Sequence, residues 1–154
     1  MNNNEELIQT FYDAFGRLDY ATMQNCYSSD PVFNDPIFGI LQGDEVKCMW
    51  EMLCKSAKDF NLDAEKIVVD GEYGTCDWIA TYTFSKTGRR VVNKVKAHMR
   101  IENGKIIEHT DEFDIYKWSR QALGLPGILL GWSGYLKNKI RSDAKNKLIK
   151  FMRN

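Results

Sequence analysis

The sequence predicts a single α+β domain in which helices come first and antiparallel strands follow. Its 154 residues are close to the common size of one domain. Apolar residues recur at helical spacing as far as residue 57, and from residue 62 the period of the pattern changes to two. Helices followed by strands are typical of the α+β class, with the helices packed against one face of a curved sheet.

The first third of the chain carries three helical patterns and one short strand. Helices are expected over residues 5–18, 19–27 and 44–57, with Asn4 and Asp19 as the first two N-caps. Asp30-Pro31 should end the second helix, because a residue that precedes proline avoids the α region. Residues 32–35 then form a short extended piece that Pro36 closes.

Four strands are expected in the middle of the chain, where apolar and polar residues alternate. They cover residues 62–69, 76–85, 90–102 and 105–116. Residues 86–89 and Asn103-Gly104 carry the turn chemistry that joins the last three strands as hairpins.

The tail after residue 116 has a different character. A short helix over residues 117–123 leads into an apolar, glycine-punctuated loop over 124–132, and an amphipathic helix begins near Tyr135. We expect residues 1–123 to form the domain and residues 124–154 to belong to the same unit. The favoured interpretation packs the helix on the fold through the apolar stripe Leu136, Ile140, Ala144, Leu148 and Met152. Two alternatives stay open: a basic helix on a membrane surface, and a cap that covers a pocket or swaps onto a partner.

Bulk properties narrow the classes of function. Lys+Arg and Asp+Glu number 21 each, so the net charge is zero and no basic field favours nucleic acid. The first residues lack the basic and apolar regions of a secretory signal, and no apolar run approaches the ~18 residues of a membrane span. The four cysteines have no C-x-x-C spacing and suggest reduced thiols, which fits a cytoplasmic protein.

The order of several local patterns resembles the nuclear transport factor 2-like superfamily. The patterns are the opening helix that runs into Leu18-Asp19-Tyr20, the Phe33-x-Asp35-Pro36 strand, Gly43 before the third helix, and the hairpin Met99 to Ile106. Within that superfamily the match is closest to the ketosteroid isomerase-like and SnoaL-like (polyketide cyclase-like) branch, and it covers about residues 5–123. The resemblance implies a cone-shaped curved sheet, with the tail outside the matched region.

The same resemblance implies a general base, but the residues that bind an oxyanion in ketosteroid isomerases are not matched in this sequence. In ketosteroid isomerases the Asp-Pro dipeptide at this position holds the general base, which here is Asp35. Those enzymes also place a tyrosine on the first helix and a neutral aspartic acid on the second-last strand to bind an oxyanion. An ungapped match puts Phe11 and Ala97 at these places, and neither side chain donates a hydrogen bond. This argues against steroid isomerisation by that mechanism.

Strand parity adds two polar residues to the expected site. If Asn103-Gly104 lies in a three-residue loop, His109 and Asp111 share the inner face with the apolar residues of the preceding strand. A two-residue loop would instead turn two glutamates inward, so the first register is favoured. His109 and Asp111 then act as acid/base partners or orienters of Asp35. The residues expected to wall this pocket are Phe11, Trp50, Ala97, Met99 and Phe113.

Three functions remain open on the sequence. The first is an isomerase, cyclase or hydrolase that acts on a small apolar molecule with Asp35 as the base and with neither cofactor nor metal. The second is a binding module that holds such a molecule without chemistry. The third is a dimeric interaction domain, since Trp78, Tyr82 and Phe84 alternate along one strand and are expected on the outer sheet face, where they would pair two subunits.

Overall fold

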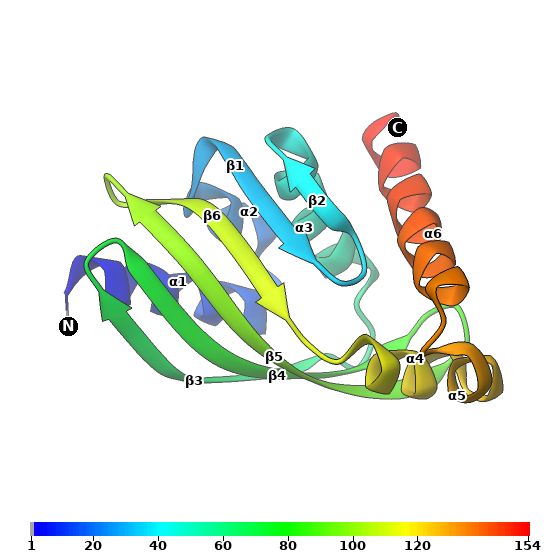
Figure 1. The fold of residues 1–154 in the computed structure, drawn as a ribbon. Helices are drawn as coiled ribbons and strands as arrows, with labels where there is room; N and C mark the ends of the chain where they lie inside the picture. The colour runs from blue at the N-terminus through cyan, green and yellow to red at the C-terminus, as the bar shows by residue number, and fades with distance from the viewer. Residues whose placement is uncertain (1) are drawn as a thin grey trace.

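A six-stranded curved sheet is the centre of the computed structural model, which describes residues 2–154. The strand order is β2-β1-β6-β5-β4-β3 (Figure 1). The strands are β1 (Tyr27–Asp35), β2 (Gly39–Gln42), β3 (Asn61–Asp70), β4 (Tyr73–Phe84), β5 (Arg89–Glu102) and β6 (Lys105–Glu112). Neighbouring strands are antiparallel except β1 and β6, which are parallel.

Six helices accompany the sheet. They are α1 (Asn3–Gly16), α2 (Tyr20–Asn25), α3 (Asp44–Ser56), α4 (Ile115–Leu123), α5 (Leu125–Leu130) and α6 (Gly134–Met152). The N-cap of α1 is Asn2, two residues earlier than expected, whereas Asp19 caps α2 through the Thr22 backbone N–H as expected. No helix in the described part of the chain is long and apolar enough to cross a membrane.

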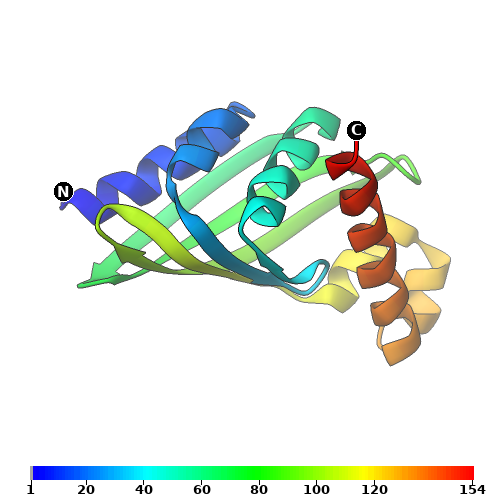
Figure 2. The ribbon, with the colours of Figure 1, turned by 90° about the horizontal axis from the view of Figure 1, so that it is seen from above.

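The structure confirms the α+β class and the curved sheet with N-terminal helices over one face. In Figure 2 α1 and α3 lie across the same face of the sheet, and α6 stands at the end opposite the N-terminus. The core between these layers contains buried side chains from α1 (Ile8, Phe11, Phe15) and α3 (Trp50). Few polar residues are buried in the described part of the chain, and His109 and Asp111 are two of them. They mark the candidate site.

The β5–β6 hairpin differs from the expected loop but reaches the expected faces. Asn103 and Gly104 both have positive φ, 54° and 73°, and form a two-residue turn. The register of the two strands then shifts by one residue. Ile101 pairs with Ile106, but the next residue of β5, Arg100, pairs with Glu108. Ile107 is thus a bulge residue. The bulge restores the parity that a three-residue loop would give, so His109 still faces inward.

Strand β1 begins earlier than predicted and passes through Pro31. The register between β1 and β6 breaks between Tyr27 and Val32, so Pro31 lies in an irregular stretch where its missing N–H costs no ladder bond. The Pro31 carbonyl is used by the backbone N–H of Gly43, at 2.8 Å. Asp30-Pro31 was expected to end the second helix. It lies inside β1 instead, where it interrupts the pairing of that strand with β6.

The tail is more helical than predicted. Asp114 caps α4 through the backbone N–H groups of Tyr116 and Lys117, so the helix starts inside the expected last strand. The predicted loop 124–132 contains α5. Helix α6 packs against α3, and its side chains Leu136, Ile140 and Leu148 are buried whereas Met152 is 40% exposed.

Candidate functional site

A chain of hydrogen bonds runs through the core from α3 to β6. Trp50 Nε1–H donates to Tyr27 Oη at 2.9 Å, and Tyr27 Oη lies 2.6 Å from His109 Nδ1. His109 Nε2 lies 2.8 Å from Asp111 Oδ1. Tyr27 already accepts from Trp50, so its own proton is available for His109 Nδ1. His109 then carries its proton on Nε2 and donates it to the Asp111 carboxylate.

Four aromatic rings pack around His109. The imidazole is stacked with Trp50 and Tyr27, at centroid distances of 6.2 and 6.1 Å, and meets Phe11 and Phe33 edge-on at 5.7 and 5.1 Å. Only 1% of His109 is exposed, and both ring nitrogens have partners. His109 is therefore arranged to orient Asp111, and it does not reach a ligand itself.

Asp35 lies at the end of β1 with its carboxyl directed inward. Its Oδ1 accepts from the backbone N–H groups of Ile37 at 2.9 Å and Phe38 at 2.6 Å. The residue is half-buried. Burial raises the pKa of Asp35 to about 7; the Phe38 N–H opposes this shift and the negative charge of Asp111 adds to it.

The parallel pairing of β1 with β6 brings the two carboxyl groups together. Phe33 pairs with His109 and Asn34 with Thr110, so Asp35 and Asp111 follow in the same register on the same face. Adjacent strands lie about 4.8 Å apart, which makes the two side chains neighbours. Their surroundings differ: Asp111 accepts a hydrogen bond from His109, whereas Asp35 is held only by backbone N–H groups among residues 2–154.

Two buried donors near this pair have no hydrogen-bond partner among the described residues. They are Tyr12 Oη on α1 and Trp78 Nε1 on β4, whose rings are 6.1 Å apart. Burial is the first cause that raises the pKa of Tyr12 well above its ordinary value, and the charge of Asp111 is the second. An unpaired buried donor costs about 1–3 kcal/mol. Trp78 opposes the shift in the pKa of Tyr12 as a side-chain hydrogen-bond partner of Tyr12, so the two groups lie close together and the Tyr12 O–H is left to donate to an oxygen atom bound nearby.

The outer-face position predicted for Trp78, Tyr82 and Phe84 is wrong. Trp78 packs on Phe15 in the core at 5.5 Å, and Tyr82 Oη accepts from Trp118 Nε1 at 2.8 Å. Phe84 lies against Trp118, at 5.3 Å. The sequence reasoning missed that α4 covers this end of the inner face, so an aromatic stripe there needs no second subunit. Whether the chain dimerises stays a prediction.

The predicted wall residues lie around the network. Phe11, Trp50, Ala97 and Met99 are buried, and Phe113 is partly buried at the edge of the core. Ala97 pairs with Asp111 across β5 and β6, and both residues are buried. As the sequence indicates, Phe11 and Ala97 donate no hydrogen bond. Tyr12 and Trp78 provide such donors from other positions.

Sequence reasoning missed four polar or aromatic groups that reach the core. Tyr27 was missed because its strand was expected to begin only at Val32. Asn93 is 9% exposed and interrupts the buried series Val91, Val95, Ala97 on β5, a signal that strand parity could have shown. The others are Tyr12 and Trp78. Among residues 2–154, no three His, Cys, Asp or Glu side chains are placed to hold a metal ion.

Solved structures with the same fold support this description of the cone. An NTF2-like protein of unknown function from Burkholderia pseudomallei is 23% identical, with 79% of this chain and 98% of that chain covered and a TM-score of 0.70. A protein with a ketosteroid isomerase-like fold from Catenulispora acidiphila, in complex with trimethylamine, is 14% identical, with 79% and 95% covered and a TM-score of 0.69. An LEH-like epoxide hydrolase from M. tuberculosis is 18% identical, with 84% and 96% covered and a TM-score of 0.67.

The family itself is shown by a sequence match. No curated protein matches the chain. The model of the SnoaL-like domain matches residues 8–109, which includes most of α1, the Asp35 strand and His109, and which is well over half of the chain. The chain therefore belongs to the SnoaL-like domain family.

Proposed function

We propose that the chain binds a small, largely apolar molecule next to Asp35 and transfers a proton on it, with Asp35 as the general base. The observation that carries this proposal is the pair of carboxyl groups Asp35 and Asp111 on neighbouring strands in unlike surroundings. Two neighbouring carboxyl groups that are held in different surroundings can take different roles in a proton transfer.

Each member of the pair has a physical reason for its role. His109 donates a hydrogen bond to Asp111 and holds that carboxyl in place, so Asp111 is less free than Asp35 to accept a proton from a ligand. Asp35 has a pKa near neutrality, and a base is most effective when its pKa is close to the working pH. His109 acts as a positioning residue, since its nitrogens are already occupied by Tyr27 and Asp111.

The unpaired donors suggest how charge on the ligand is stabilised. When Asp35 removes a proton from a carbon beside a carbonyl group, negative charge develops on the carbonyl oxygen. Tyr12 O–H and Trp78 N–H are preorganised donors of the kind that stabilise such an oxygen in a site shielded from water. Asp35 then holds the proton and returns it to another carbon or to the oxygen, so no cofactor is needed for the step.

The similar structures are compatible with this class of reaction. One of them is an epoxide hydrolase and another holds trimethylamine, so this fold accommodates both hydrolysis and the binding of small molecules. Fold alone does not assign the activity, and the proposal depends on the side chains of this chain.

A binding module without chemistry is the second candidate. Phe11, Tyr27, Phe33 and Trp50 fill the centre of the cone around His109, which supports a rigid receptor as well as an enzyme. A homodimer through the outer sheet face also stays a proposal. That face has a hollow of about 920 Å³ with charged residues of both signs, among them Asp77, Lys94, Lys96 and Glu112.

Proton transfer can be tested without knowing the natural substrate. A panel of aromatic ketones such as 2-tetralone is incubated with the protein in D₂O, and NMR follows exchange at the carbons beside the carbonyl. The wild type should accelerate exchange of at least one ketone, and Asp35→Asn should abolish this while ketone affinity stays within about tenfold. Equal exchange rates in the two proteins would remove the general-base role. Binding without exchange would favour the binding module.

A further inference from the structure

An exposed apolar surface surrounds α5, away from the carboxyl pair. Of the thirteen large hydrophobic residues that are exposed in the described chain, six fall within residues 125–135. They are Leu125, Ile128, Leu129, Leu130, Trp132 and Tyr135, with exposed fractions from 44% to 73%. Contiguous exposed apolar side chains of this size mark an interaction site. We call these six residues the α5 patch.

Tight packing on the opposite side of α5 fixes this orientation. A Cβ atom at Gly127 would collide with the backbone carbonyl of Ser119, so α5 lies directly on α4. Tyr116 Oη donates to the Ile128 carbonyl at 3.2 Å, and Trp132 Nε1 donates to the Leu129 carbonyl at 3.0 Å. Small residues therefore face the protein and large apolar residues face water. This is the reverse of an ordinary surface helix.

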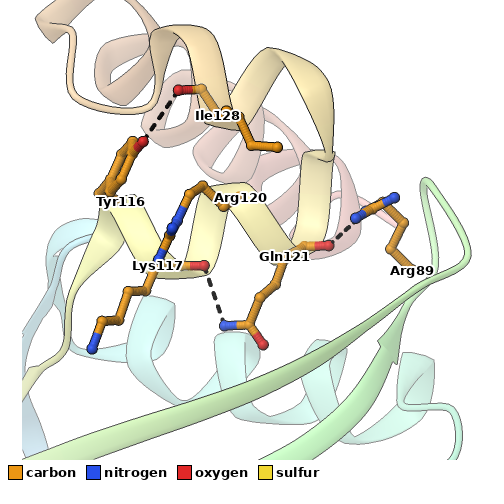
Figure 3. A pocket seen from close by; sticks show the side chains of 6 residues that line it. All are labelled: Arg89, Tyr116, Lys117, Arg120, Gln121 and Ile128. Carbon is orange, nitrogen blue, oxygen red and sulfur yellow. Dashed lines mark hydrogen bonds between the residues drawn. The ribbon is translucent and has the colours of Figure 1, made fainter.

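A cationic hollow adjoins the patch. It has a volume of about 390 Å³ and is lined by Arg89, Tyr116, Lys117, Arg120, Gln121 and Ile128 (Figure 3). Within residues 2–154, none of its three cations forms an ion pair with a carboxylate. Arg120 lies over the Tyr116 ring at 4.8 Å, and Arg89 Nε donates to the Gln121 carbonyl at 2.8 Å.

Ile128 belongs to both features and joins them into one surface. We propose that this surface binds an anionic phospholipid membrane, with the α5 patch at the acyl boundary and Arg89, Lys117 and Arg120 against lipid phosphates. Apolar side chains bordered by cations are the combination that holds a peripheral protein on such a bilayer. A free phosphate compound would use the cations but would leave the six apolar side chains without a role.

Helix α6 is not the membrane element in this account. Its apolar stripe is turned inward, with Leu136, Ile140 and Leu148 buried. The proposal places the membrane contact on α4, α5 and the residues that flank them, with only Tyr135 from the first turn of α6, and makes the carboxyl site independent of it. Loss of membrane binding should therefore leave proton transfer unchanged, and failure of either proposal can be recognised separately.

Vesicle binding tests the proposal with the full chain. Vesicles of equimolar phosphatidylglycerol and phosphatidylcholine, and vesicles of phosphatidylcholine alone, are mixed with the protein and floated on a density gradient. The wild type should float with the anionic vesicles and much less with the neutral ones. Fluorescence should shift to the blue on binding, and the shift reports on Trp132, which is 69% exposed while Trp50, Trp78 and Trp118 are buried.

Variants separate the two parts of the surface. Trp132→Ser combined with Leu129→Ser should weaken binding by about tenfold or more, and Lys117→Gln with Arg120→Gln should weaken binding to the anionic vesicles by a similar factor. Lys147→Gln with Lys150→Gln removes the same charge from the far half of α6 and should leave binding unchanged (Figure 1). Circular dichroism confirms that each variant is folded.

Three results would overturn the proposal. The first is no flotation of the wild type with either kind of vesicle. The second is binding of soluble glycerol phosphate in calorimetry while vesicles fail to bind, which would assign the cations to a soluble anion. The third is a dimer in light scattering that Trp132→Ser converts to a monomer, again without vesicle binding, which would assign the patch to a second copy of the chain.

Discussion

Tyr27→Phe is predicted to destabilise the fold although it removes a single oxygen atom. The Tyr27 hydroxyl links Trp50 Nε1 to His109 Nδ1, and both of these groups are buried. Without the hydroxyl each is left unpaired, at about 1–3 kcal/mol per group, or about 2–6 kcal/mol for two. Small shifts of the surrounding rings should recover part of this. We expect the free energy of unfolding to fall by about 2–4 kcal/mol.

Urea denaturation followed by tryptophan fluorescence measures this loss. Tyr73→Phe is the matched control, because Tyr73 is 61% exposed and the removal of its hydroxyl should change stability by less than about 0.5 kcal/mol. A loss of under about 1 kcal/mol in Tyr27→Phe, with an unchanged m-value, would refute the reasoning. The Trp50–Tyr27–His109 chain would then not be a structural support of Asp111.

Two further predictions concern Asp35 and the tail. Because the pKa of Asp35 rises from 3.8 in the unfolded chain to about 7, the native state binds more protons across that window, and wild-type stability falls as pH rises through it. Asp35→Asn does not titrate, so its free energy of unfolding minus that of wild type should rise by about 2–4 kcal/mol between about pH 4 and pH 8. Asp70→Asn controls for the lost charge. A difference, variant minus wild type, that stays constant or falls as pH rises would contradict the sign. Leu148→Ala should lower the free energy of unfolding by about 2–5 kcal/mol, because Leu148 is 2% exposed and belongs to the main core. Leu125→Ala is the control and should be nearly neutral, because Leu125 is 65% exposed. Equal thermal melting curves for Leu148→Ala and wild type would show that α6 does not stabilise the domain.

The fold class could be predicted because the hydrophobic period reports which element forms and which face it buries. Val95, Ala97 and Met99 alternate with exposed residues on β5 as expected. The alternating pattern does not predict which face of a strand turns inward when both faces carry apolar residues. On β4, Trp78 and Ile79 are both apolar and the pattern fits either face, so only the cover supplied by α4 decides which residues turn inward.

The candidate site could be predicted only in part, for a similar reason. His109 and Asp111 were placed together by local spacing on one strand. Their neighbours depend on pairings between distant segments: Tyr27 is 82 positions from His109 in sequence, and Asp35 reaches Asp111 only through the parallel β1–β6 ladder. The bulge at Ile107 shows that a correct face can follow from a wrong loop, since one extra residue has the same effect on parity wherever it is inserted.

The most direct test of the account is a ¹³C NMR titration of the Asp35 carboxyl carbon in the wild type and in Asp111→Asn. If the two carboxyl groups are neighbours in a shielded site, the wild-type midpoint lies at about 7. In Asp111→Asn it falls, because a negative charge next to Asp35 is gone, but it stays above the ordinary value of 3.8, since burial remains. A wild-type midpoint near 3.8, or a midpoint that Asp111→Asn leaves unchanged, would contradict the paired site.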